Sequence, residues 1–318
     1  MRLITRGWQD YALLDTGAGA KLERYGEYIV VRPEPQATWA PALPRSAWEA
    51  AHAVFHEVVP RIRPPGTTAA GDAGPEEAAG TAGTGPNGWW ERRRPVPDQW
   101  PMAYGALRFW VRLTPFRHLG VFPEQAPHWD WLRRTIRRAI GRGAAPPRVL
   151  ALFAYTGLGT LAAASAGARV THVDSSRKAV VWARANQALS KLSDRPVRWI
   201  VDDALKFVAR EARRGARYEG LLLDPPPFGH GPRGERWRLE RSLPLLLDRC
   251  RAVLAERPCF IVLTTYAARL GPDTLRAALE QTTTGYGGRI EAGTLALLER
   301  SAGRILVPAC FARWRTAS

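Results

Sequence analysis

An acid followed by three prolines ends one of the most apolar runs in the sequence. Asp224 closes the run at 218–224, and Pro225, Pro226 and Pro227 lead directly to Phe228. Consecutive prolines cannot continue a strand, because each lacks a backbone N–H and has a fixed φ. The chain therefore holds a carboxylate and an aromatic ring stiffly beyond the end of a predicted strand, where both can meet a bound molecule.

A glycine-rich turn follows the apolar run at 148–155. Gly157, Gly159 and Ala162 have the spacing G-x-G-x-x-A at the start of an Ala-rich helix predicted at 159–167. Glycines let the backbone approach a ligand, and a helix N-terminus favours a carboxylate or a phosphate. Between a strand and a helix, such a turn is typical of nucleoside sites. Tight strand–helix packing is the alternative interpretation.

Further acids end the next two predicted strands. Asp174 lies 17 residues after Gly157, where an acid accepts hydrogen bonds from both hydroxyls of an adenosine ribose. Asp202 and Asp203 end the third strand, beside the expected adenine, and we favour Asp203 as acceptor for its exocyclic amine. Capping of the following helix is an equally good interpretation of this pair, because acids are common at that position.

These side chains require a sheet whose strands end at one edge. From residue 148 onward, apolar runs alternate with helical patterns, as parallel strands buried on both faces require. Only ERSAG separates the last two strands, so they must form an antiparallel hairpin. The predicted fold is α/β, a doubly wound, seven-stranded, mostly parallel Rossmann-like sheet. The predicted strands are 148–155, 169–174, 197–203, 218–224, 259–266, 289–297 and 304–314, and the helices are 128–140, 159–167, 178–192, 204–215, 242–255 and 272–283.

The first third of the chain has a different character. Residues 20–32 and 102–114 alternate like strands, whereas 46–59 reads as a helix. Residues 64–88 hold almost no large apolar side chains, so we predict a disordered insertion. The predicted organisation is a small mixed α/β N-terminal region at 1–63, the insertion at 64–88, a β segment leading into the cofactor site at 89–126, and the main domain at 127–318.

The net charge of +17 is unevenly distributed. Residues 1–88 carry 8 basic and 10 acidic side chains, whereas residues 89–318 carry 38 basic and 19 acidic ones. This asymmetry favours nucleic acid as the partner of the main domain. Because 42 of the 46 basic residues are Arg, an Arg-rich solvated surface without such a partner is the alternative.

Several classes of protein are not expected. No apolar run reaches 18 residues, and the first 15 residues lack the apolar core of a signal peptide. Cys250, Cys259 and Cys310 are odd in number and lack metal-ligand spacing, which argues against a disulfide framework and fits a reducing, cytoplasmic setting. His52 and His56 have the i, i+4 spacing of a metal pair on the predicted helix, but no third ligand is evident, so we expect no metal.

The glycine turn and Asp174 would suit either a nicotinamide nucleotide or S-adenosylmethionine. The acid–Pro–Pro sequence and the terminal hairpin favour S-adenosylmethionine. The segments VLALFAYTGLGTLA, VDDALKFV and LLLDPPPFG resemble, in this order, the class I S-adenosylmethionine-dependent methyltransferases. Within that class, residues 118–314 look like the group of bacterial 23S (large-subunit) ribosomal RNA methyltransferases of the cytosine-C5 and guanine-N7 types. HLGVFPEQ at 118–125 resembles that group's cofactor-facing segment.

The resemblance implies that S-adenosyl-L-methionine is the methyl donor. The residues expected to hold it are Phe122, Gln125, Tyr155, Thr156, Gly157, Gly159, Asp174, Ser175, Asp203, Ala204 and Asp224. Catalysis is expected at Asp224, Pro225 and Phe228, since Phe228 could stack on a base while Asp224 and the Pro225 carbonyl orient its edge.

Two departures from the family pattern bear on the acceptor atom. Cytosine-C5 relatives carry Cys after the fifth strand, where this chain has Thr264, Thr265 and Tyr266, so we favour a base nitrogen of RNA, in particular ribosomal RNA. Amino-methyltransferases place an aromatic residue directly after Pro-Pro, whereas Pro227 intervenes here. This second departure counts against a nitrogen acceptor, so the sequence leaves the acceptor atom open. A methyltransferase acting on a small molecule or protein, and an RNA-associated protein without transfer activity, are the alternatives.

The loop 229–237 is predicted to contact the substrate. His230, Arg233 and Arg236 would face phosphates, and Trp237 would stack on a base. An ordinary surface loop anchored by Trp237 is an equally good interpretation. Arginines that could extend a phosphate track, or could simply be helix-surface charges, lie at 92–94, 133–138 and 210–217.

Overall fold

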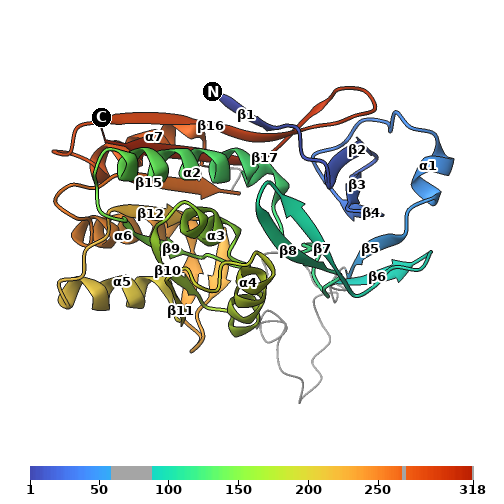
Figure 1. The fold of residues 1–318 in the computed structure, drawn as a ribbon. Helices are drawn as coiled ribbons and strands as arrows, with labels where there is room; N and C mark the ends of the chain where they lie inside the picture. Colours follow the sequence, from blue (N-terminus) through green and yellow to red (C-terminus); the bar gives the residue numbers. More distant parts are fainter. Residues whose placement is uncertain (59–87, 267–269, 317–318) are drawn as a thin grey trace, which may run out of the picture.

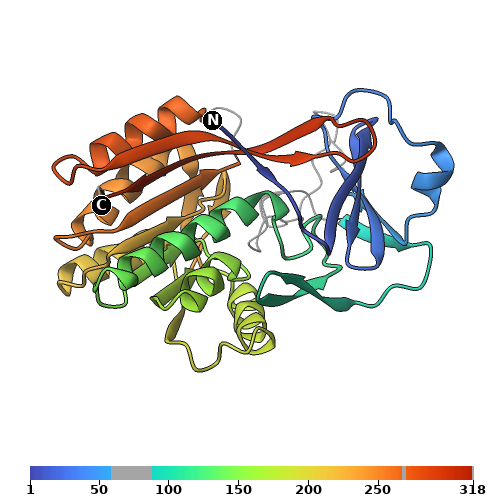
Figure 2. The same ribbon diagram turned by 45° about the horizontal axis from the view of Figure 1, so that its top comes forward.

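The computed structural model describes residues 1–58, 88–266 and 270–316. A large α/β layer and a β-rich N-terminal region lie side by side (Figures 1 and 2). None of the helices in the described ranges has the length and apolar character that spanning a bilayer requires. The predicted insertion at 64–88 falls, apart from Gly88, outside the described residues.

The α/β layer contains an eight-stranded sheet. In spatial order its strands are β1 (Arg2–Thr5), β16 (Arg289–Leu298), β17 (Ile305–Arg315), β15 (Phe260–Thr265), β12 (Gly220–Leu223), β9 (Arg148–Leu152), β10 (Arg169–Asp174) and β11 (Val197–Val201). Among them β17 alone runs against its neighbours. The doubly wound, mostly parallel sheet with a terminal antiparallel hairpin is confirmed. The sheet has one strand more than predicted. The additional strand is β1, which pairs with β16 at the edge of the sheet.

Helices cover both faces of the sheet, as alternate residues of its central strands show. Leu221 and Leu223 pack with residues of the helices on one face, whereas Leu222 packs on the other. Burial of both side-chain directions explains why the strands read as continuous apolar runs. The helices are α2 (Ala126–Gly141), α3 (Leu158–Ser165) and α4 (Arg177–Leu189) on one face, and α5 (Ala204–Arg213), α6 (Leu239–Ala252) and α7 (Pro272–Thr282) on the other.

Two smaller sheets form the N-terminal region. They comprise β2 (Tyr11–Gly17), β3 (Ala20–Tyr25), β4 (Tyr28–Pro33), β5 (Ala53–Glu57) and β6 (Gly88–Arg92), and the pair β7 (Gln99–Tyr104) and β8 (Leu107–Arg112). The strands predicted within 20–32 and 102–114 are thus confirmed. One core cluster joins this region to α2 and α3, with Trp8, Trp100 and Phe109 packed near Trp129 and Leu161.

The helix predicted at 46–59 is wrong. Among the described residues of this range, only those of α1 (Arg45–Glu49) are helical, and Ala53, Val54 and Phe55 belong to β5, which pairs with β4 and β6. The β-branched and aromatic side chains of this segment suit a strand buried between two neighbours. The premise of a helical histidine pair fails with it, because His56 pairs with Glu91 and His52 accepts a hydrogen bond from the Ile29 N–H.

Candidate cofactor and substrate site

The C-terminal ends of β9, β10, β12 and β15 meet at one edge of the sheet, where the short helix η2 (Pro123–Gln125) faces them. Gln125 Nε2 donates to Asp224 Oδ2 at 2.8 Å and to the Tyr266 hydroxyl at 3.1 Å. The Phe122 ring centroid lies 5.7 Å from that of Tyr155 and 5.2 Å from that of Tyr266. The structure therefore brings together Phe122, Gln125, Tyr155 and Asp224, as predicted.

Tyr266 is a site residue that the sequence does not predict. The sequence draws attention to it only because a cysteine is absent from its segment. Its position, one residue beyond β15, is the signal that could have identified it, because the ends of neighbouring parallel strands share an edge.

Asp224 is an acid with one carboxylate oxygen shielded from solvent. Its Oδ1 atom is buried and has no hydrogen-bond partner among the described residues. Burial raises the pKa of this carboxyl to about 7; the Gln125 hydrogen bond opposes the shift, and the charges of Glu124 and Asp174 add to it. Pro225, the next residue, is buried. Asp224 thus offers an oxygen that is free to accept a hydrogen bond. Its carboxyl group gains and loses a proton near neutral pH.

The two glycines of the turn serve different purposes. Gly157 has φ +84°, and a Cβ there would lie 2.9 Å from the Cβ of Ala183, so packing alone demands glycine. At Gly159 a Cβ would meet only a Leu222 methyl at 3.7 Å. A cavity of about 70 Å³ beside Gly159 is also lined by Gln125 and Asp224. The missing side chain at Gly159 therefore leaves space for a ligand.

Asp174 is held between two turns. Its Oδ2 accepts the Tyr155 N–H and its Oδ1 the Ser176 N–H, both at 2.8 Å. Burial raises the pKa of Asp174, whereas these two hydrogen bonds lower it. Each carboxylate oxygen keeps a second lone pair, so the group can still accept from two hydroxyls. Ser175, partly exposed between Asp174 and Ser176, lies at the same edge.

Asp203 caps α5. Its Oδ1 accepts the Lys206 N–H at 2.8 Å, so the capping interpretation is confirmed for this residue. Asp202 is buried; it accepts the Asp203 N–H and pairs with Arg210. The cap uses Asp203 Oδ1 and leaves Oδ2 as the carboxylate oxygen outside it. The neighbouring Ala204 is buried, which limits its contribution to the backbone.

The Thr156 side chain serves the fold. Its hydroxyl donates to the Gly120 carbonyl at 2.6 Å, and its own carbonyl accepts from Asn186 Nδ2 at 2.9 Å. Because the Thr156 side chain is buried and hydrogen-bonded, the predicted contact of Thr156 with the cofactor would have to come from its backbone. The role of the side chain is to fasten the segment that carries Phe122 to the glycine turn.

The predicted loop 229–237 contains a short hairpin, β13 (Phe228–His230) paired with β14 (Arg236–Arg238). Trp237 is only 5% exposed; its Nε1 donates to the Pro226 carbonyl at 2.6 Å and its ring packs against Phe153. The stacking role predicted for Trp237 is therefore wrong and the anchoring interpretation is confirmed. The hairpin instead presents Phe228, which is 67% exposed.

The turn of this hairpin is organised by Glu235, a residue that the sequence does not single out. Glu235 accepts from Lys206 Nζ at 2.5 Å and from the Arg233 N–H at 2.9 Å. These interactions, with the Lys206 ammonium as the largest influence, lower the pKa of Glu235 to about 2. His230, Arg233 and Arg236 all lie on the exposed side of the hairpin.

A likeness across nearly the whole chain identifies the family. The structure of the SAM-dependent methyltransferase from Agrobacterium tumefaciens superposes with a TM-score of 0.85 and is 40% identical, covering 99% of this chain and 93% of its own. The chain belongs to the S-adenosylmethionine-dependent methyltransferases. The predicted methyltransferase family, fold and cofactor are confirmed. No family model matches the chain.

More distant similarities agree with this assignment. "Ribosomal RNA large subunit methyltransferase K/L" of Shewanella sp. (strain ANA-3) is 35% identical over 134 residues, 42% of this chain and 18% of its own length. The protein of the same name from Stutzerimonas stutzeri is 35% identical over 168 residues, 52% of this chain and 22% of its own. This methyltransferase thus spans about a fifth of these curated relatives. SMU.776 in complex with SAH, 16% identical with a TM-score of 0.64 over 96% of this chain and 75% of its own, shows the shared fold alone.

The site of this methyltransferase fits S-adenosylmethionine. An unpartnered carboxylate oxygen on Asp224 suits a cationic or amine-bearing group, the space at Gly159 admits backbone approach, and Asp174 suits a ribose. When bound, S-adenosylmethionine supplies a methyl group activated by a sulfonium sulfur. The protein's task is then to align an acceptor and to exclude water.

Several of the arginines predicted to extend a phosphate track form ion pairs within the protein. Arg92 pairs with Asp98, Arg93 with Glu91, Arg133 with Asp130, and Arg210 with Asp202. The structure thus favours the alternative, helix- and loop-surface charge, for these four. Arg134 and Arg138, on the exposed side of α2, form no ion pair within the described part of the chain.

Proposed function

We propose that this methyltransferase transfers a methyl group to a base nitrogen of RNA, with ribosomal RNA as the first substrate to test. The observation that carries the proposal is the exposed Phe228 ring, presented only four residues beyond the free acceptor atom of Asp224. An exposed aromatic beside an acceptor suits a flipped or unpaired base, which stacks on one and hydrogen-bonds to the other. The names of the curated relatives support ribosomal RNA.

The donor would be held at the edge where the four strands end. The residues proposed to contact it are Phe122, Gln125, Tyr155, Asp174, Ser175, Asp203 and Asp224, with Gly157 and Gly159 contributing backbone. Tyr266 joins this set because it shares the Gln125 amide with Asp224.

A nitrogen acceptor is favoured over cytosine C5. The C5 reaction needs a thiolate that adds to the base, and burial raises the pKa of all three cysteines, that of Cys250 to about 12. Where C5 relatives carry their cysteine, this chain has the segment 264–266, which contains none. A nitrogen nucleophile needs no covalent intermediate, so the chain contains what the reaction requires.

Asp224 is proposed to orient the nitrogen and to accept its proton. An amine that gains a methyl group becomes positively charged until it loses a proton. Asp224 Oδ1 can accept the N–H hydrogen bond beforehand and can hold the proton afterwards, because the pKa of this carboxyl lies at about 7. The three prolines keep Asp224 and Phe228 in fixed relation, and the carbonyls of Pro226 and Pro227 accept from Trp237 Nε1 and the Leu239 N–H.

The test is methyl transfer from a tritiated donor into ribosomal RNA purified from cells that lack the gene, followed by nucleoside mass spectrometry. We expect label in an N-methylated nucleoside. Phe228→Ala should raise the KM for RNA by roughly 5- to 100-fold, as loss of one stacked base implies, whereas Phe228→Trp should retain activity. Affinity for S-adenosylhomocysteine should be the same in both variants.

Two outcomes would reject this proposal. Label recovered as 5-methylcytosine would overturn the argument from the cysteines. Unlabelled RNA together with a methylated metabolite or protein in the same extract would move the substrate to another class.

A further inference from the structure

A basic groove lies away from the cofactor site. It has a volume of about 700 Å³ and is bounded by the C-terminal half of α2, the turn before β15, the turn after α7 and the end of β17. The arginines that line it are Arg134, Arg138, Arg142, Arg257, Arg313 and Arg315. They come from three separate elements of the fold, so their convergence is a property of the tertiary structure.

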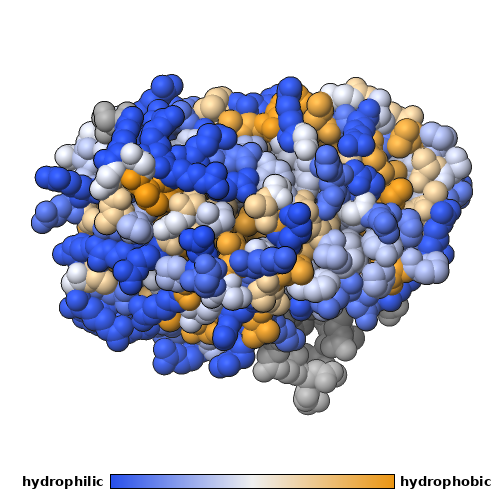
Figure 3. Space-filling model, viewed as in Figure 1, coloured by the Kyte–Doolittle hydropathy of each residue, from blue (hydrophilic) through white to orange (hydrophobic). Residues whose placement is uncertain are grey.

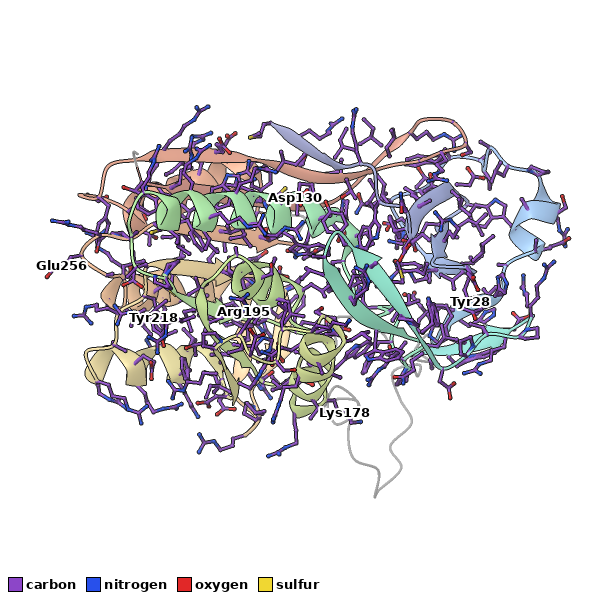
Figure 4. The ribbon with its side chains drawn as sticks, viewed as in Figure 1. Tyr28, Asp130, Lys178, Arg195, Tyr218 and Glu256 are labelled. Atoms are coloured by element: carbon purple, nitrogen blue, oxygen red, sulfur yellow. The ribbon has the colours of Figure 1, made fainter. Side chains whose placement is uncertain are left out.

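The groove and the cofactor site occupy opposite ends of the sheet. Pro258 and Cys259 line the groove just before β15 begins, and Tyr266 follows the end of β15 in the cofactor site. A six-residue strand spans about 20 Å at roughly 3.3 Å per residue. In Figure 4, Glu256 at the groove and Lys178, in the first turn of α4 beyond Asp174, lie toward opposite ends of the α/β layer.

Most of the positive charge in this groove is not neutralised. Glu291 pairs with Arg313 at 2.7 Å. Within the described ranges the other five arginines form no ion pair, and Glu256 is the one further carboxylate among the lining residues. Burial lowers the pKa of Arg313; Glu291 opposes that shift, and the positive charges of Arg134 and Arg315 add to it.

Helix chemistry accounts for only part of this arrangement. Arg134, Arg138 and Arg142 are four residues apart, so they share one face of α2, where like charges disfavour the helix. The helix dipole favours cations near the end of α2, but it does not explain Arg257 and Arg315, which come from other elements. Strongly hydrophilic side chains gather over the C-terminal half of α2 (Figure 3).

We propose that this groove binds phosphate groups of the substrate RNA, about 20 Å from the site of methyl transfer. The inference rests on the proposed function. Arginine forks match phosphate oxygens in paired hydrogen bonds, and several of them along one groove suit a repeating anion. A helical strand rises about 3.4 Å per nucleotide, so roughly six nucleotides match the length of β15.

The test compares two double variants of the full chain. Arg134→Gln with Arg138→Gln changes the groove. Arg184→Gln with Arg300→Gln is the matched control, since both residues are exposed and form no ion pair within the described residues. Binding of a labelled single-stranded RNA of about 20 nucleotides is followed by anisotropy between roughly 50 and 300 mM KCl. Affinity for S-adenosylhomocysteine verifies that the cofactor site is intact.

Removal of two arginine–phosphate interactions should reduce the slope of log K against log salt by about 1.4 in the groove variant. The control should keep the wild-type slope. In the transfer assay, the groove variant should show about a tenfold higher KM for ribosomal RNA with kcat unchanged, since the interaction is equally strong in the ground state and the transition state.

Each failure has its own signature. Equal slopes in the groove and control variants, alongside normal transfer to RNA, would overturn the groove while leaving the proposed function intact. Absence of transfer to any RNA by the wild-type protein would defeat the proposed function instead. If the groove variant loses affinity for inorganic phosphate or polyglutamate but not for RNA, the groove serves another anion and the inference is wrong.

Discussion

Asp224 is the residue whose chemistry depends most directly on its surroundings. A carboxyl with a pKa of about 7 keeps its proton in the folded protein at pH values where the unfolded chain, with a pKa of about 3.9, has released it. The folded state therefore loses stability as pH rises from about 4 to 7.

Asp224→Asn should remove this dependence. One pKa unit corresponds to about 1.4 kcal/mol, so the excess stability of the variant over the wild type should grow by about 2 to 3 kcal/mol between pH 5 and pH 8. Urea denaturation without cofactor measures it at both pH values. Methyl transfer by the variant should be lost at either pH. A stability gain of equal size at the two pH values would contradict a buried, protonated carboxyl.

The glycine turn offers a matched pair of substitutions. Gly157→Ala should lower the unfolding free energy by about 1 to 3 kcal/mol, because φ is +84° and Ala183 is too close. Gly159→Ala should leave stability within about 0.5 kcal/mol or raise it, since the position is helical and open. It should nevertheless weaken S-adenosylhomocysteine binding at least tenfold by calorimetry. Unchanged binding in Gly159→Ala would show that the space beside it is not used.

The sequence predicts single site residues well where the family resemblance and the predicted position at a strand end indicate the same residue. Gln125, Asp174 and Asp224 are predicted on that basis and lie at one edge of the sheet. Trp237 is misread because its burial depends on a partner distant in sequence, Phe153. Residue type alone does not distinguish a buried anchor from an exposed contact.

At the scale of elements, the hairpin β13–β14 is the device that presents Phe228. Its only deeply buried side chain is Trp237, among the hairpin residues that the structure describes. Trp237→Phe should cost about 1 to 2 kcal/mol through loss of the bond to the Pro226 carbonyl. Trp237→Ala should cost about 3 to 5 kcal/mol.

Hydrogen exchange provides the local readout for these two variants. Protection of the amides in 228–238 should fall before that of β12, because the hairpin has no other anchor of this size among its described residues. If exchange in the hairpin is unaffected by Trp237→Ala, Phe228 is positioned by the prolines alone.

The strands and helices after residue 148 are predictable, because burial on both faces and short helical crossovers give strong apolar periodicity. The strand in the segment 46–59 is not predictable from the sequence. Ala53, Val54 and Phe55 continue a helical apolar pattern, and they form a strand only because they pair with β4 and β6. The hairpin β13–β14 also cannot be predicted from the sequence, because it too depends on tertiary contacts. Its polar and glycine residues carry no periodicity, and a buried tryptophan holds it in place.

For the whole molecule, two buried histidines should set its sensitivity to acid. Burial lowers the pKa of His128 and of His172 to about 3, and Arg313 adds to the effect at His128. The unfolded chain binds these protons near a pH of about 6.5. The contribution of these two neutral histidines to the free energy of unfolding is therefore fully present above that pH. It falls as the pH decreases toward 3.

His128→Leu should make the protein less sensitive to acid. Each buried histidine contributes a slope of about 1.4 kcal/mol per pH unit, so the variant should lose that much of the slope between pH 6 and pH 4. Neither ring nitrogen of His128 has a hydrogen-bond partner in the described structure, and the ring packs edge-on against Phe311. Unfolding curves at several pH values test this, and an unaltered slope would show that His128 can be protonated in the folded state.

The edge strand β1 has a consequence for how the protein is made. Residues 2–5 pair with residues 294–297, which leave the ribosome about 290 residues later. At roughly 5 to 20 residues per second this delay is about 15 to 60 s. During that time the first strand has no partner in the large sheet, and β16, once synthesised, exposes an open edge until β1 reaches it. Pairing of β1 therefore cannot begin before residues 294–297 are synthesised, and both unpaired edges are open to aggregation until it does.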